Sequence, residues 1–245
     1  MKSIDILGCR VDAIDRPAAV ARAAELANGG SPSLVVTLGV EMVMRARRDP
    51  EFRAIVNGAA LCLCDTIGLL LASRARNGPL RSRVPGVELV TDLAARSADR
   101  HDVRLYLLGG SGDTAARAAQ ALTRRCPGAA ICGARDGFFP PSENDAVARA
   151  VAASGANLLL LGLGSPKQER WFVEHGAATG CGAGIGVGGS FDVLAGTARR
   201  APRVVQKLGL EWAYRLVREP RRWRRQLALP QFVVAVAQDL VAGRR

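Results

Sequence analysis

One acidic residue follows a short apolar stretch, and that position suits acid–base chemistry. Asp65 comes directly after Leu61–Cys64, which reads as a buried strand. A carboxylate at such a strand end could take a proton from an attacking hydroxyl group. Aspartate is also common at the N-cap position of helices, so Asp65 could instead cap the helix that follows. The residue alone leaves both interpretations open.

A glycine-rich segment at 162–171, GLGSPKQERW, has residue types that suit an anion. Gly164 would let a ligand approach the backbone, and the helix that follows would offer free N–H groups to a phosphate. Lys167 and Gln168 add side-chain donors. A tight strand-to-helix turn with no ligand would explain the same segment equally well.

A second segment of this kind, GIGVGGSFD, occupies 184–192. Gly188 lies in its turn, and Asp192 could accept hydrogen bonds from a ribose or a base. Two such turns at neighbouring strand ends favour a nucleotide diphosphate as the ligand. The similar segment Gly109–Asp113 is expected to be structural, as a turn and helix cap.

Basic residues are concentrated near the carboxyl end of the chain. The whole chain has a net charge of +12, and residues 199–225 carry ten basic against two acidic residues, a net +8. The partner of this region should be anionic: a phosphate, a nucleic acid or an acidic membrane surface. A solvated basic face is the plain alternative. Trp212, Tyr214 and Trp223 interleave with the arginines, which favours a membrane interface over nucleic acid.

Arginines are better candidates than a metal ion for neutralising a leaving diphosphate. The chain has no Asp-x-Asp motif and only two histidines, so we expect no metal site. Arg81 and Arg83 lie in a segment, 77–85, that we expect to be an exposed loop, and either could clamp a phosphate. The spacing Cys62-x-Cys64 fits neither a zinc nor a redox site, and six reduced cysteines suit the cytosol.

The composition predicts how these residues are positioned. Of the 245 residues, 49% are hydrophobic and only 4% aromatic, which is typical of a core of Val, Leu, Ile and Ala in parallel strands covered by helices. The start of the chain is unlike a signal peptide, and no apolar run reaches the roughly 18 residues that span a bilayer.

Strand and helix patterns alternate along most of the chain. We expect strands at 4–8, 33–38, 61–64, 103–108, 129–133, 157–161 and 184–187, with helices between them. This order predicts an α/β fold: a Rossmann-like, mainly parallel sheet with helices on both faces. Residues 1–195 would form this domain, and 196–245 a helical, Arg-rich appendage with helices over 201–216 and 231–241. Ligands of such sheets bind outside the carboxyl ends of the strands.

Several motifs together resemble one known family. They are VVTLGVEMV from residue 35, DTIG from 65, RVPG at 83–86, GARDGFF at 133–139, GLGSPKQE at 162–169, GVGGSFD at 186–192 and RRAPRVVQKLGLEWAYRLVREPRRWRR at 199–225. Spanning nearly the whole chain in this order, they resemble the WecG/TagA/CpsF family, glycosyltransferase family 26.

The resemblance implies a hexosyltransferase that works by inversion, without a metal or other cofactor. Such enzymes move N-acetylmannosamine or a related sugar from a UDP-sugar to an undecaprenyl-diphosphate-linked saccharide, in teichoic acid, exopolysaccharide and other cell-wall or surface polysaccharide biosynthesis. The implied location is cytoplasmic, as a peripheral membrane protein at the inner face of the plasma membrane. The implied partners are the donor, the lipid-linked acceptor and an anionic membrane surface, with no nucleic acid; a homo-oligomer is left open.

Site residues carry over by position. In the resemblance Asp65 looks like the catalytic base, and Thr37, Arg83 and Gln168 match pocket positions. The appendage of the family is thought to complete the site with arginines. Here these correspond best to Arg215, Arg222 and Arg225, with Arg221 and Arg224 as alternatives.

Two positions depart from the family pattern. Gly39 stands where the family usually has Asn, and Thr66 stands where it usually has Gly. Gly39 puts the identity of the sugar or acceptor in question, and it keeps a catalytically altered membrane-surface module of the same fold as an alternative. A nicotinamide-dependent oxidoreductase is a second alternative, but LGCRVD stands where its glycine fingerprint would follow the first strand.

Overall fold

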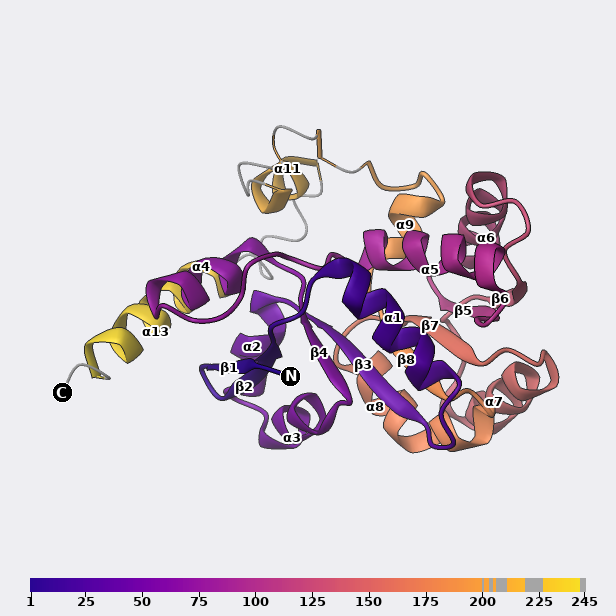
Figure 1. Ribbon diagram of the computed structural model, residues 1–245, viewed down its shortest axis with the longest axis horizontal. Coiled ribbons are helices and arrows are strands. Elements are labelled where there is room, and N and C mark those ends of the chain that lie inside the picture. The colour runs from indigo at the N-terminus through magenta and orange to yellow at the C-terminus, as the bar shows by residue number, and fades with distance from the viewer. Residues whose placement is uncertain (200, 203–204, 206–210, 219–226, 243–245) are drawn as a thin grey trace.

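The computed structural model describes residues 1–199, 201–202, 205, 211–218 and 227–242. Its centre is a six-stranded, wholly parallel sheet (Figure 1), which confirms the predicted fold class. The strand order across the sheet is β4, β3, β8, β7, β5, β6. The strands are β3 (Ser33–Leu38), β4 (Leu61–Cys64), β5 (Leu105–Gly109), β6 (Ile131–Arg135), β7 (Leu158–Gly162) and β8 (Ala183–Gly186).

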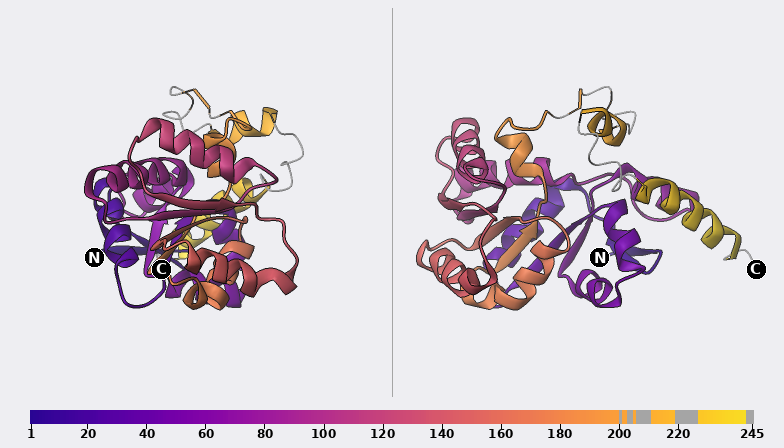
Figure 2. Two further views of the ribbon diagram at one scale, coloured as in Figure 1. Left: turned by 90° about the vertical axis from the view of Figure 1, so that its right-hand side faces the viewer. Right: turned by 180° about the vertical axis from the view of Figure 1, so that it is seen from behind.

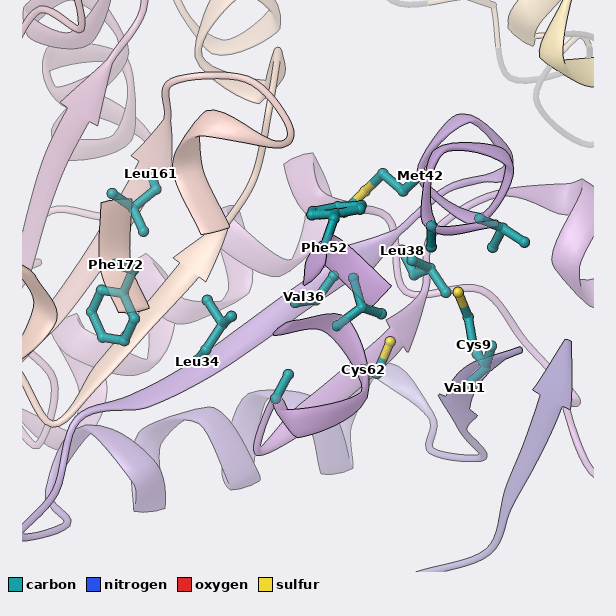
Figure 3. Packing of buried hydrophobic residues seen from close by; sticks show 14 of the residues in the cluster. Cys9, Val11, Leu34, Val36, Leu38, Met42, Phe52, Cys62, Leu161 and Phe172 are labelled. Carbon is teal, nitrogen blue, oxygen red and sulfur yellow. The ribbon is translucent and has the colours of Figure 1, made fainter. Parts of the chain in front are cut away.

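Two apolar cores cover the two faces of the sheet. Side chains of a strand alternate between faces, so Leu34, Val36 and Leu38 of β3 belong to one core and Val35 to the other. Figure 3 shows part of the first core, with Phe52 lying beside Val36 and Leu38.

Helices lie on both faces of the sheet, as two further views show (Figure 2). The first core is covered by α2 (Val40–Ala46), α3 (Pro50–Gly58), α4 (Ile67–Ala75), α7 (Asn144–Ala153) and α8 (Lys167–His175). The second is covered by α1 (Arg16–Ala27), α5 (Gly86–Arg100), α6 (Thr114–Arg125) and α9 (Ser190–Leu194). Two short 3-10 turns, η1 (Pro141–Glu143) and η2 (Gly176–Thr179), flank α7 and α8.

The first expected strand is not part of the large sheet. Instead, β1 (Ser3–Ile6) and β2 (Cys9–Asp12) form a separate antiparallel hairpin. Leu7 and Gly8 both have positive φ, as the tightest hairpin turns require. A strand in this region is thus confirmed as far as Ile6, but its expected extent to residue 8 and its place in the parallel sheet were wrong, because Gly8 lets the chain reverse there. The hairpin is tied to the sheet where Cys62 donates its N–H to Asp12.

The remaining expected strands are confirmed to within about two residues, which places every strand end of interest on one rim. Thr37 and Leu38 end β3, Asp65 follows β4, Gly162 ends β7 and Gly186 ends β8. Because all six strands run in the same direction, these residues meet at the carboxyl rim of the sheet.

Two further helices are described beyond residue 199. They are α11 (Glu211–Arg218) and α13 (Ala228–Ala242), which packs against α2 and lies beside α4 (Figure 1). Residues 201–202 are not helical, so the helix expected from 201 does not start there. In the described part of the chain, no helix combines the length and hydropathy that crossing a bilayer requires. The boundary at 195/196 stays a prediction.

Candidate active site

The carboxylate of Asp65 is joined to the first turn of α5. Its Oδ1 accepts a hydrogen bond of 2.8 Å from the backbone N–H of Gly86, the first residue of that helix. The cap of α4, the helix that follows Asp65, is Thr66. Asp65 is thus not the N-cap of its own following helix, and that interpretation was wrong. The positive end of α5 instead favours a negative charge at Asp65.

Gly86 also brings Asp65 close to the ends of two central strands. A Cβ added at Gly86 would lie 3.1 Å from Ser190 Oγ, 3.5 Å from the carbonyl oxygen of Val187 and 3.6 Å from Thr37 Oγ1. Glycine at position 86 therefore avoids a tight contact with the Ser190 hydroxyl. Asp65 therefore shares one small region with β3 and the loop after β8.

The predicted pocket residue Thr37 bridges β3 and β8. Its hydroxyl donates a hydrogen bond of 2.6 Å to the carbonyl oxygen of Gly186. This bond fixes the side chain at the rim and leaves the lone pairs of the hydroxyl oxygen as acceptors.

Gln168 links the loop after β7 to the loop after β8. Its Oε1 accepts a hydrogen bond of 3.3 Å from the N–H of Gly188, and its Nε2 donates one of 2.7 Å to Glu169 Oε1. Gln168 and Glu169 are both buried, and Glu169 is fully so. Burial raises the pKa of the Glu169 carboxyl, because desolvation disfavours its charged form. Sequence reasoning missed Glu169, although an acidic residue directly after Gln168 in a strand-end motif was a usable signal.

The two predicted glycines, Gly164 and Gly188, have positive φ angles of 79° and 50°. A Cβ at either would meet no heavy atom within 4 Å, so both border open space. This arrangement lets a ligand approach the backbone, as the sequence predicted.

Lys167 and Asp192 have mainly local surroundings. Lys167 donates a hydrogen bond of 3.3 Å to the carbonyl oxygen of Gly137, and its ammonium lies 5.1 Å from the centre of the Phe139 ring. Asp192 lies in the first turn of α9, where a carboxylate suits the positive end of the helix. Their predicted ligand contacts stay predictions.

The segment from 77 to 85 is more buried than expected. Leu80 and Val84 are buried, and Val84 donates its N–H to the carbonyl oxygen of Cys64. The expectation of an exposed loop was wrong at these positions, because both apolar side chains enter cores of the domain. Arg81 donates to the carbonyl oxygen of Gly78 within the loop itself.

The same segment places Arg83 beside the rim. Its guanidinium lies 2.9 Å from the Glu211 carboxylate of α11. Arg83 is also close enough to Cys64 to oppose the effect of burial, which raises the pKa of that thiol to about 12. A thiol with so high a pKa is a poor nucleophile, so Asp65 is the better candidate for chemistry at this strand end.

The two departures from the family pattern are neighbours in space. A Cβ added at Gly39 would lie 3.3 Å from Cγ2 of Thr66. The hydroxyl of Thr66 is buried and has no hydrogen-bond partner in the described part of the chain. Gly39 and Thr66 thus form one structural feature, in which the threonine methyl fills space that a side chain at 39 would need.

Two further features lie outside this cluster. Gly109 and Gly110 pack closely against Gly162 and Thr114, which agrees with a structural role for that turn. A hollow of about 540 Å³ adjoins the cluster at Val87, next to Gly86, and reaches Tyr214 of α11.

Over the described residues, no three His, Cys, Asp or Glu side chains are grouped as metal ligands.

The structure therefore brings Asp65, Thr37, Gln168, Gly188 and Arg83 to one rim of the sheet. Three predicted appendage residues are not tested. Arg222 and Arg225, and the side chain of Arg215, lie outside the part that the structure describes.

Known proteins are similar to this chain over most of its length. A model of the glycosyl transferase WecG/TagA/CpsF family matches residues 4–245. The N-acetylglucosaminyldiphosphoundecaprenol N-acetyl-beta-D-mannosaminyltransferase of Bacillus spizizenii is 34% identical over 204 residues, 83% of this chain and 78% of the relative. The protein of that name from Bacillus subtilis is 29% identical over 207 residues, 84% of this chain and 80% of the relative. The chain belongs to the WecG/TagA/CpsF family of glycosyltransferases.

Proposed function

We propose that this glycosyltransferase moves N-acetylmannosamine from UDP to N-acetylglucosaminyl-diphospho-undecaprenol. The sugar and acceptor follow the names of the two relatives. The observation that carries the proposal is the bond between Asp65 and Gly86, which holds one carboxylate beside the ends of β3 and β8. Glycine-lined loops follow the neighbouring strand ends and suit a nucleotide diphosphate.

The proposed mechanism is a single displacement with inversion. UDP lies across the loops at 162–168 and 186–192. Asp65 takes the proton of an acceptor hydroxyl, whose oxygen bonds to the anomeric carbon of the sugar. The bond from that carbon to the diphosphate oxygen breaks, and UDP departs with the electron pair.

Positive and polar groups stabilise the charge that develops on UDP. Gln168 provides an N–H group at the rim. Arg83 lies close to Cys64, the residue before Asp65, and Arg215, Arg222 and Arg225 of the appendage are proposed to supply further cations. No metal ion or cofactor is part of this mechanism.

We propose that the enzyme works at the inner face of the plasma membrane as a peripheral protein, because its proposed acceptor is linked to a lipid. Large apolar side chains are exposed on α4, α11 and α13, and include Leu71, Val217, Val233, Val234 and Val241. Together with the net charge of +12, they suit an anionic membrane surface, which binds amphipathic basic elements.

A transfer assay tests the proposed function directly. The enzyme is incubated with UDP-N-acetylmannosamine and a short-chain polyprenyl-diphosphate-N-acetylglucosamine, and the product is identified by mass. We expect one added hexosamine and one UDP released per product. UDP-N-acetylglucosamine is the matched control donor. If neither donor yields product while UDP still raises the melting temperature, the proposed pair of substrates is wrong.

A further inference from the structure

Glu169 is a fully buried carboxylate that the proposed mechanism does not use. It lies in the first turn of α8, and it has no exposed surface. Oε1 accepts from Gln168, and the Ser165 hydroxyl and the backbone N–H of Glu169 also favour the charged carboxylate. Burying a carboxyl group is unfavourable unless it has partners of this kind, so its position next to a pocket residue needs an explanation.

The hydrogen bonds of the Gln168 carboxamide can be counted atom by atom. The backbone N–H of Gly188 can only donate, so the atom of Gln168 that faces it must be the oxygen. The amide nitrogen then faces Glu169 and gives it one of its two N–H bonds. Among the described hydrogen bonds the second N–H has no acceptor.

The end of β8 is shaped to admit this pair. A Cβ at Gly186 would lie 2.5 Å from Gln168 Nε2 and 2.9 Å from Glu169 Oε1. These distances are too short for a real contact, so only glycine at 186 allows the two side chains to lie against the strand. The carbonyl oxygen of the same Gly186 accepts the hydroxyl of Thr37. The pair is thereby built into the rim on which the donor is proposed to lie.

We propose that Glu169 is a positioning residue, which orients the Gln168 carboxamide so that its remaining N–H is presented to an oxygen atom of the sugar nucleotide. Glu169 provides the acceptor on one side of the amide, and Gly188 provides the donor on the other. Without Glu169 the amide is held at one end and can turn away from the ligand. This role rests on the proposed function, since that function places the donor at these loops.

A set of variants tests this role. Glu169→Gln keeps an acceptor oxygen in the same place, whereas Glu169→Met keeps a similar volume without one. We expect Glu169→Gln to retain kcat/KM for the UDP-sugar to within about threefold, and Glu169→Met to raise KM about tenfold or more, because small displacements of a positioned group are costly. Gln168→Ala should remove the same contact.

The double variant separates positioning from a purely structural role. If Glu169 acts through Gln168, Glu169→Met should cost less than about threefold in kcat/KM once Gln168→Ala is present. The proposal would be overturned if the loss of kcat/KM in the double variant equals the product of the two single losses. It would also be overturned if Glu169→Met has the KM of the wild type. If Glu169→Met does not fold, Glu169→Asp withdraws the carboxylate by one methylene and should give the same loss of affinity.

Binding of UDP gives a readout that does not need turnover. The dissociation constant of UDP, measured by calorimetry for the same variants, should follow the same non-additive pattern when the ligand oxygen belongs to the diphosphate. An effect on KM for the UDP-sugar without an effect on UDP binding places the oxygen on the sugar, and still supports positioning. If the wild-type enzyme binds UDP but transfers no sugar, only the proposed substrates are wrong. If it neither binds UDP nor transfers sugar, the proposed function and the positioning role of Glu169 are both wrong.

Discussion

Arg83 and Glu211 form an ion pair of 2.9 Å that joins the candidate active site to α11. The two residues are 128 positions apart in the chain, and their side chains are only 19% and 26% exposed. Helix α11 is thus held next to the loop that ends at Gly86, whose N–H binds Asp65. Any ligand that needs the Arg83 guanidinium must share it with Glu211.

Neutralising Arg83 should affect activity more than stability. We expect Arg83→Gln to lower kcat/KM by about tenfold or more, because a cation beside the departing diphosphate is lost. The ion pair itself is partly solvated, so its coupling energy should not exceed about 1 kcal/mol. Urea unfolding of Arg83→Gln, Glu211→Gln and the double variant measures this coupling. A coupling above about 2 kcal/mol would show that the pair is mainly structural.

The contact between Gly39 and Thr66 predicts a second coupling. A side chain at 39 would press against the Thr66 methyl, which lies 3.3 Å from the position of its Cβ. We expect Gly39→Asn to cost about 1 kcal/mol more stability in the wild-type background than in a Thr66→Gly background, because overpacking is relieved there. Urea unfolding of the four proteins measures the difference. Equal costs in both backgrounds would mean that the two positions are independent.

Burial of Glu169 predicts a pH-dependent stability difference. Its pKa is raised in the folded protein above the ordinary value of 4.5. A carboxyl group whose pKa is raised by folding contributes most to the free energy of unfolding below its pKa in the unfolded chain. This contribution is lost as the pH rises through the pKa of the group in the folded protein. Relative to wild type, Glu169→Gln should therefore become more stable as pH rises from 4 towards neutrality. Melting temperatures of both proteins across this range test the sign, and a constant or falling difference would contradict it.

The exposed apolar side chains of α13 predict that this helix takes part in the proposed membrane binding. Val233 and Val234 are 65% and 56% exposed. We expect Val233→Glu with Val234→Glu to reduce cosedimentation with anionic vesicles, because acidic side chains are repelled by the surface and lose apolar contact. Val173→Glu on α8 is the matched control, since Val173 is 60% exposed. Equal losses for both variants would argue against α13 as the contact.

Local patterns were sufficient to predict most of the fold. Apolar runs such as 158–162 mark strands buried on both faces, and Asp49 and Pro50 mark the start of α3 by a cap and a first-turn proline. The hairpin of β1 and β2 was missed because only one strand, over 4–8, was expected there, and Cys9–Asp12 was not recognised as its partner.

The candidate site could be predicted in part. Asp65 and Thr37 stand at strand ends, and Gln168 lies at the start of the helix that follows β7; functional groups of parallel sheets gather at this rim. Glu169 was missed because glutamate is almost always exposed and its burial depends on tertiary packing, although its place directly after Gln168 was a usable signal. The pairing of Arg83 with Glu211 has no local signal.

The role of Asp65 as the base is tested most directly by Asp65→Asn. The amide oxygen can still accept the hydrogen bond of the Gly86 N–H, so the fold and UDP binding should persist. An amide cannot act as the base that removes the proton of the acceptor hydroxyl. We expect transfer of N-acetylmannosamine to fall by at least about a hundredfold, with the dissociation constant of UDP nearly unchanged. Turnover close to wild type in the folded Asp65→Asn enzyme would contradict the assignment.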